Sequence, residues 1–173
     1  AHRYPAPAIG ATAALIAAMD VIAAVANLGL KTALIRFVPT MGSRAARVVA
    51  AAYALAGAVA VAGALVFVAV HGRWFPELTL LSSRPGAAFF VASTFLWVIF
   101  FLQDSVLVGI RRAAWVPVEN AGFAAAKLAL LVVLVAPLPT WGMYVSWCLP
   151  LLVVVVAVNG AAFPLLRRGD GQA

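Results

Sequence analysis

A carboxylate inside an apolar segment is the first residue of this sequence that points to chemistry. Asp20 belongs to a stripe of small and polar residues at intervals of four, three, four, three and four: Ala13, Ala17, Asp20, Ala24, Asn27 and Lys31. This spacing predicts that they share one face of an α-helix. A carboxylate at the centre of a bilayer costs about 2.5–3.5 kcal/mol on insertion scales, so it must face protein or a water-filled cavity. Asp20 is therefore either a cation- or proton-binding group on a cavity face, or a structural carboxyl that is protonated or hydrogen-bonded to a neighbouring helix.

Further polar residues lie inside later apolar segments. Asp104 stands near the end of the third segment, Glu119 opens the fourth, and Lys127 lies about two turns inside it. Intramembrane charges usually find partners, so we expect Asp104 and Lys127 to pair and hold the two helices together. In a transporter such a pair would open and close as the cavity changes sides. An unpaired Lys127 would instead extend toward the membrane surface. For Asn159, in the fifth segment, we expect a hydrogen bond to a neighbouring helix.

The composition indicates the elements that carry these residues. Of the 173 residues, 66% are hydrophobic and 10% are charged, whereas soluble domains carry about 25% charged residues. Crossing the hydrocarbon core takes about 20 apolar residues. Five runs reach that length, over about 9–35, 47–70, 86–110, 117–136 and 141–166. The predicted fold class is an all-α integral membrane protein, a single domain formed by a bundle of five transmembrane helices.

The arginines sort by side of the membrane. Seven lie on one side, between the first and second spans, between the third and fourth, or after the fifth: Arg36, Arg44, Arg47, Arg111, Arg112, Arg167 and Arg168. Three fall on the other side: Arg3, Arg73 and Arg84. The positive-inside rule places the larger group in the cytoplasm, with the N-terminus of this chain outside and its C-terminus inside. Plain topology accounts for most of these arginines, and binding of lipid phosphates is the alternative.

Several classes of function are excluded by the sequence. The net charge of +7 comes from residues at the ends of apolar runs, which argues against nucleic-acid binding. Cys148 is the only cysteine, so there is no internal disulfide, and we expect a small packing residue. No metal-ligand cluster, cofactor motif or catalytic signature is present, and the chain is not expected to be an enzyme.

Two segments resemble a known transporter family. The run from Gly10 to Pro39, which ends Asn-Leu-Gly-Leu-Lys-Thr-Ala-Leu-Ile-Arg-Phe-Val-Pro, resembles the second transmembrane helix of polysaccharide-type flippases. These belong to the multidrug/oligosaccharidyl-lipid/polysaccharide exporter superfamily. The segment from Phe101 to Asn120, with its basic turn, is similar to the junction between their fourth and fifth helices. The resemblance implies that the five spans are the second to sixth helices of an N-terminal lobe, and that the chain is a piece of a longer protein.

The resemblance also implies a function. The chain would be part of a transporter that flips or exports lipid-linked oligosaccharide or polysaccharide units across the bacterial cytoplasmic (inner) membrane. Its partners would be membrane lipids, the lipid-linked oligosaccharide and other envelope polysaccharide synthesis proteins. Cavity-lining or ion-coupling candidates are Asp20, Asn27, Lys31, Asp104 and Lys127, and headgroup-binding candidates are Arg36, Arg44, Arg111 and Arg112. The alternatives are a drug/cation antiporter of the same superfamily and a non-transporting scaffold of a polysaccharide synthesis complex.

Overall fold

The computed structural model describes residues 4–139 and 141–168, and in these residues all regular structure is helical. The helices are α1 (Ala6–Asn27), α2 (Leu30–Phe37), α3 (Ala45–Trp74), α4 (Arg84–Gly109), α5 (Trp115–Val133) and α6 (Gly142–Arg168). Short 3-10 turns lie at Val38–Thr40, Gly42–Arg44 and Thr79–Ser82. Five helices of the described part are long and apolar enough to cross a membrane. The prediction of an all-α chain with five helices able to span a membrane is confirmed for the described residues.

The first predicted span is not one continuous helix. Leu28 and Gly29 both adopt left-handed backbone conformations, with φ of 46° and 76°. Glycine takes this conformation without a steric penalty. The side chain of Asn27 accepts a hydrogen bond from the backbone N–H of Lys31 at 3.2 Å, which satisfies a donor that the break would otherwise leave free. The prediction of a single helix over about 9–35 is therefore wrong, and Lys31 belongs to α2.

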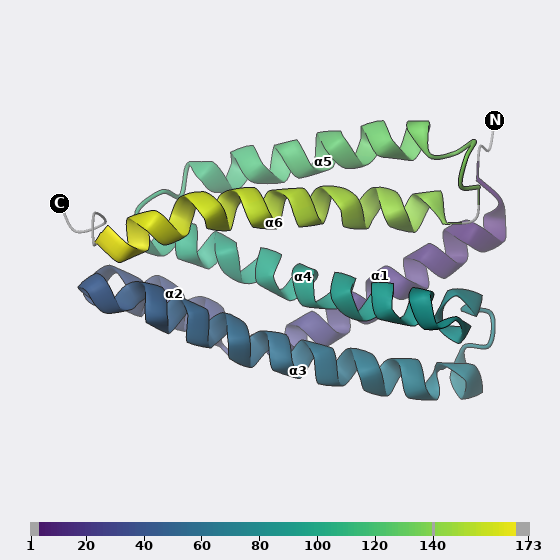
Figure 1. Ribbon diagram of the computed structural model, residues 1–173, viewed down its shortest axis with the longest axis horizontal. Coiled ribbons are helices and arrows are strands. Elements are labelled where there is room, and N and C mark those ends of the chain that lie inside the picture. Colours follow the sequence, from purple (N-terminus) through teal and green to yellow (C-terminus); the bar gives the residue numbers. More distant parts are fainter. Residues whose placement is uncertain (1–3, 140, 169–173) are drawn as a thin grey trace.

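The helix α4 lies at the centre of the bundle. It contacts α1, α2, α3, α5 and α6 and has more buried residues than any other described helix for which burial is given. In Figure 1, α3 and α4 run side by side, α5 and α6 form a second pair, and α1 crosses at a tilt behind them. The C-terminal end of the chain, α2 and the start of α3 lie at one end of the bundle. This arrangement lets side chains of α4 meet every other long helix.

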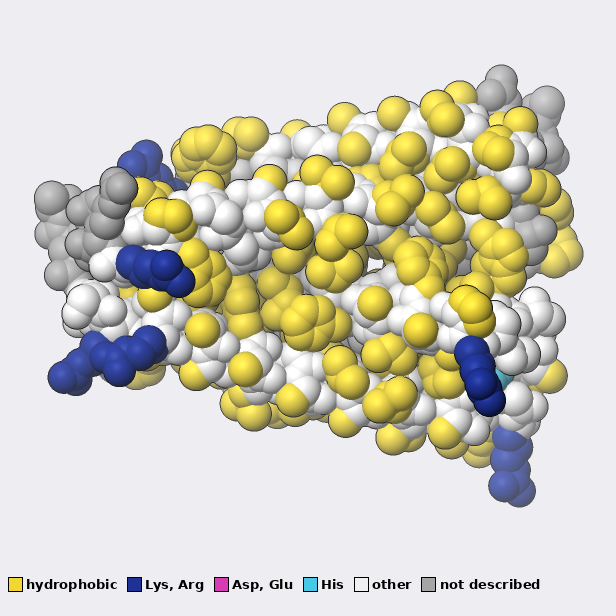
Figure 2. All heavy atoms as spheres, viewed as in Figure 1, with side chains coloured by type: hydrophobic (Ala, Val, Ile, Leu, Met, Phe, Trp, Pro, Cys, Tyr) yellow, Lys and Arg dark blue, Asp and Glu magenta, His cyan; other side chains and the backbone are white. Residues whose placement is uncertain are grey.

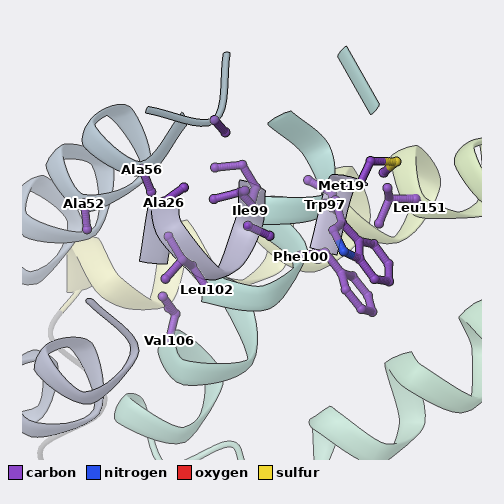
Figure 3. Close-up of a cluster of buried hydrophobic side chains, with 14 of the residues drawn as sticks. Met19, Ala26, Ala52, Ala56, Trp97, Ile99, Phe100, Leu102, Val106 and Leu151 are labelled. Atoms are coloured by element: carbon purple, nitrogen blue, oxygen red, sulfur yellow. The ribbon is translucent and has the colours of Figure 1, made fainter. Parts of the chain in front are cut away.

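Small residues allow the helices to approach closely. Four alanines at intervals of four residues are buried along α3: Ala52, Ala56, Ala60 and Ala64. Figure 3 shows Ala52 and Ala56 in a cluster with Ala26 of α1, Leu102 of α4 and neighbouring apolar side chains. Because lipid tails are as apolar as these side chains, membrane helices associate through close packing rather than a hydrophobic driving force. The alanine row therefore brings α1 and α4 against α3.

The surface has the distribution expected of a membrane protein. Hydrophobic side chains cover the long faces of the helices in Figure 2, and the lysine and arginine side chains visible on this face lie toward the two ends. Large apolar side chains such as Val21, Leu65, Val133 and Val153 are more than half exposed. Exposed apolar surface on this scale indicates contact with lipid or another apolar surface. Arg3 lies outside the described residues, and of Arg168 only the backbone is described.

Candidate functional site

The polar stripe of the first span lies on the uncovered side of α1. Ala13, Ala17, Asp20 and Ala24 are exposed, and Asn27 and Lys31 are half-buried. The opposite face of α1 packs against the bundle through Ala8, Thr12, Leu15, Met19, Ala23 and Ala26. The described helices therefore do not cover the stripe. A carboxylate at this depth still has to face water or protein, so the stripe requires either an aqueous cavity or a further protein surface.

Asp20 is tied to the neighbouring helix by one hydrogen bond. The indole Nε1–H of Trp97 donates to Asp20 Oδ1 at 2.7 Å. Trp97 lies midway along α4 and is only 7% exposed, so it holds the carboxylate at the edge of the packed core. The other carboxylate oxygen is left for a ligand or water. The hydrogen bond to a neighbouring helix that the structural alternative expects for Asp20 is present, and its role in ion coupling stays a prediction.

Trp97 is the centre of an aromatic cluster formed by Trp97, Phe100 and Phe101 of α4, Phe123 of α5 and Trp147 of α6. Its ring centroid lies 5.6 Å from that of Phe100, 4.9 Å from that of Phe101 and 5.7 Å from that of Trp147. Figure 3 shows Trp97 and Phe100 together in the core. Phe101 and Trp147 are half-buried, whereas Phe123 is buried. The cluster therefore joins α4, α5 and α6 and also reaches the partly exposed surface.

Two lysines lie on this aromatic cluster. Lys31 Nζ is 4.2 Å from the centroid of the Phe101 ring, and Lys127 Nζ is 4.0 Å from the centroid of the Trp147 ring. An ammonium group over an aromatic face is stabilised by about 0.5–2 kcal/mol, depending on its desolvation. Both lysines are half-buried, so each keeps access to a ligand. Asp20, Lys31 and Lys127 are therefore connected through one set of aromatic rings.

The predicted ion pair between Asp104 and Lys127 is wrong. Both residues are described, and no ion pair joins them. The ammonium of Lys127 lies over Trp147 instead, while the Asp104 carboxyl interacts with Glu119. The physical reason is depth: Lys127 follows Glu119 by two turns of α5, about 12 Å along the helix. Asp104 lies near the depth of Glu119 and does not reach that of Lys127.

A network of partly buried polar groups lies near the basic end of the bundle, and its hydrogen bonds link α3, α4 and α6. The hydroxyl of Tyr53 in α3 donates to Asn159 Oδ1 of α6 at 2.9 Å. Asn159 Nδ2 donates to Gln103 Oε1 of α4 at 2.8 Å, and Gln103 lies beside Glu119 of α5. The expected interhelical hydrogen bond of Asn159 is confirmed. The network explains how three polar side chains are tolerated inside a membrane bundle.

The four candidate headgroup-binding arginines are exposed at this end. Arg36 closes α2, Arg44 precedes α3, and Arg111 and Arg112 form the turn between α4 and α5. Arg112 also lines an apolar cavity of about 310 Å³ between the end of α4, the start of α5 and α6. The guanidinium groups are thus available to phosphates at the membrane surface, and their role stays a prediction.

Sequence reasoning missed the aromatic cluster and the contact between Asp104 and Glu119. The residues Trp97, Phe101, Phe123 and Trp147 are spread over three helices with no common motif. Among the described residues, no group of three or more His, Cys, Asp or Glu side chains is arranged to hold a metal ion.

Comparison with known proteins gives no relative: no protein-family model, curated protein or solved structure matches this chain. The five long apolar helices of the described residues support the class of multi-pass α-helical membrane proteins.

Proposed function

We propose that this chain is part of a transporter that flips or exports lipid-linked oligosaccharide or polysaccharide units across the bacterial cytoplasmic membrane. One observation carries the proposal: Asp20, Lys31 and Lys127 each contact a ring of the same aromatic cluster, and Asp20 lies on the face of α1 that the described helices leave uncovered. Charged groups at this depth are costly unless they serve a substrate or ion pathway. A plain structural bundle would not need them.

The chemistry of this face suits an anionic, sugar-bearing headgroup. Lysine ammonium groups bind phosphate as point charges, and flat aromatic rings offer apolar surface to the faces of sugar rings. The carboxylate of Asp20 accepts hydrogen bonds from sugar hydroxyls or holds a coupling cation. The lipid tail would remain in the bilayer, since the surrounding helix faces are apolar.

The exposed arginines at one end would attract the same headgroup before it enters. Arg36, Arg44, Arg111 and Arg112 lie at the end that the positive-inside rule assigns to the cytoplasm. A substrate made in the cytoplasm would therefore meet these charges first. In this proposal the N-terminus of the chain is outside and its C-terminus is cytoplasmic.

A drug/cation antiporter is the second candidate, because an aromatic cluster beside a carboxylate is also suited to organic cations. The two lysines favour the first candidate. Lys31 and Lys127 sit on the rings that an organic cation would occupy, and like charges repel. An anionic substrate uses the same lysines as attractive groups.

The proposal is tested by transport in proteoliposomes that contain the longer protein carrying this chain. The probe is a fluorescent polyprenyl-pyrophosphate oligosaccharide, and the measurement is the fraction of sugar that becomes accessible to a membrane-impermeant lectin. Lys31→Gln combined with Lys127→Gln is expected to lower the flipping rate at least tenfold. Arg73→Gln, an exposed arginine at the opposite end, is the matched control and is expected to retain the rate.

An unchanged rate in the double lysine variant would refute the proposal. Competition by a tetraalkylammonium ion, with no response to the pyrophosphate probe, would instead support the antiporter. For the coupling role, Asp20→Asn is expected to make transport slow and independent of the ion gradient. Undiminished transport by Asp20→Asn would remove Asp20 from the coupling mechanism.

A further inference from the structure

The apolar cavity at the basic end of the bundle is an open groove. Its volume is about 310 Å³; Leu107 and Ile110 of α4 form one wall, and small side chains of α6, among them Ala157 and Ala161, form the other. Figure 1 shows the turn between α4 and α5 and the C-terminal end of α6 at the same end of the bundle. Ala157 and Ala161 are exposed, so the groove is open toward the surroundings of the bundle. We call it the α4–α6 groove.

The walls of the groove suit a hydrocarbon chain. From Ala157 to Leu165, the two ends of its α6 wall, the helix rises about 12 Å. One leaflet of a bilayer has a hydrocarbon thickness of about 15 Å, half of the ~30 Å of the whole core. Water finds no hydrogen-bond partners on apolar walls, and apolar cavities of this kind stay dry. A groove that faces lipid is therefore filled by an acyl chain.

The polar end of the groove suits an anionic headgroup. Arg112 lines the groove and is exposed, and the exposed Arg167 follows the lining residue Leu165 by two positions. Trp115, which also lines the groove, is 56% exposed, and tryptophan favours the membrane–water interface. No acidic side chain of the described residues lines the groove. Arginine binds phosphate through two parallel hydrogen bonds, and basic pockets between transmembrane helices bind anionic lipid headgroups.

A second observation concerns the backbone beside Arg112. The N–H of Arg112 donates to the carbonyl of Leu107 at 2.8 Å, and the N–H of Arg111 donates to the carbonyl of Val108 at 3.0 Å. These two bonds form a Schellman motif, whose left-handed position is usually occupied by glycine. Here it is occupied by Arg111, with φ of 59°, at a cost in conformational free energy that glycine would avoid. The guanidinium of Arg111 is exposed, so this cost retains a second positive charge next to the groove.

We infer that the α4–α6 groove binds one anionic phospholipid of the surrounding leaflet. One acyl chain lies between α4 and α6, and the phosphate lies on Arg112 with Arg111 beside it. A zwitterionic lipid fits less well, because its cationic group would meet the same arginines. The inference does not depend on the proposed transport function, since it concerns a resident membrane lipid and its test involves no transport.

The test is native mass spectrometry of the full chain, released from detergent micelles that contain phosphatidylglycerol. The wild-type chain is expected to retain one phosphatidylglycerol and to prefer it to phosphatidylcholine with the same acyl chains. Arg112→Gln and Arg111→Gly are each expected to lower the affinity about fivefold, since a basic residue near an anionic membrane surface contributes about that factor. Arg73→Gln, an exposed arginine at the opposite end, is the charge control and is expected to bind like the wild type.

Two variants separate lipid binding from folding. Arg111→Gly relieves the left-handed arginine, so its thermal midpoint is expected to equal or exceed that of the wild type while its affinity falls. Ala161→Trp fills the groove and keeps every arginine, and it is expected to abolish retention. Val156→Trp is the matched control, because Val156 is 63% exposed on the same helix and does not line the groove.

Four results would overturn the inference. Equal retention of phosphatidylcholine would remove the role of the arginines, and unchanged retention in Ala161→Trp would remove the groove. Displacement of phosphatidylglycerol by an equal concentration of glycerol phosphate would show that a free phosphate suffices without an acyl chain. Retention of a polyprenyl-pyrophosphate probe with no retention of phosphatidylglycerol would assign the groove to a transported substrate instead of a resident lipid.

Discussion

Removing the amide of Asn159 is expected to weaken the bundle measurably. Asn159→Ala eliminates the acceptor of the Tyr53 hydroxyl and the donor to Gln103 Oε1. It also removes a local bond from Asn159 Nδ2 to the carbonyl of Val155 at 2.8 Å. The first two bonds join three helices, whereas the third lies within α6. Only the two interhelical bonds are expected to contribute to the packing of the bundle.

The size of the effect follows from these two bonds. Interhelical hydrogen bonds in membrane proteins contribute on average about 0.6 kcal/mol, with a maximum of about 1.7 kcal/mol. Asn159→Ala should therefore lower the free energy of unfolding by about 1.2 kcal/mol. The loss rises toward about 3.4 kcal/mol where the stranded groups of Tyr53 and Gln103 find no water, because an unsatisfied buried polar group is costly.

The assay is unfolding of the chain by SDS in mixed micelles, followed by circular dichroism. Asn120→Ala is the matched control: Asn120 Nδ2 donates only to the carbonyl of Val116, one turn back in its own helix, at 2.9 Å. Comparing the two variants cancels the local bond that both remove. Tyr53→Phe, alone and combined with Asn159→Ala, completes a double-mutant cycle whose coupling energy should be about 0.6 kcal/mol. Equal stability of the two alanine variants, or zero coupling with Tyr53, would refute the network.

Three further predictions test the packing and the site. Gly142→Ala should destabilise the chain by about 1–3 kcal/mol, because a Cβ there would lie 2.7 Å from a backbone carbonyl oxygen at the end of α5. Gly160→Ala in the same helix is the control: its Cβ would meet nothing within 4 Å, and the change should be neutral or stabilising by up to about 1 kcal/mol. If SDS unfolding showed Gly160→Ala to be the less stable of the two variants, the packing at Gly142 would be contradicted. Trp97→Phe keeps an aromatic ring but removes the donor to Asp20, and should cost about 1–2 kcal/mol; the cost should shrink in an Asp20→Ala background, and a full cost there would show that packing alone is responsible. Cys148, 3% exposed, should react with a maleimide only after unfolding, and rapid labelling of the native chain would contradict its burial.

The number and character of the spans were predictable because they depend on composition over long windows. A run of about 20 apolar residues has few alternatives to a transmembrane helix. The break at Leu28 and Gly29 was not predictable in the same way. A glycine within an apolar helix is common in membranes, and only the left-handed conformation of both residues shows that the helix ends there.

The partners of the polar residues were harder to predict than their presence. The sequence indicates the depths of Asp104 and Lys127 only to within one or two turns, and the choice between Glu119 and Lys127 as neighbour of Asp104 depends on that depth as well as on helix rotation. Rotation is set by packing, such as the alanine row of α3 against its neighbours. The same rotation brings Trp97, Phe123 and Trp147 together from three helices. No spacing within one helix contains that information.

Four candidate side chains of the described helices share a property that bears on their purpose: Asp20, Lys31, Asp104 and Lys127. Asp20 is hydrogen-bonded to an indole, the two lysines lie over aromatic rings, and Asp104 meets a second acid. None of these contacts is an ion pair, the interaction that would neutralise the charge most completely. Each instead leaves the charged group without an opposite charge beside it. A bundle selected for stability alone would replace such groups with apolar residues, at a gain of up to several kcal/mol. Their presence in this arrangement is what the proposed transport of a charged headgroup would require.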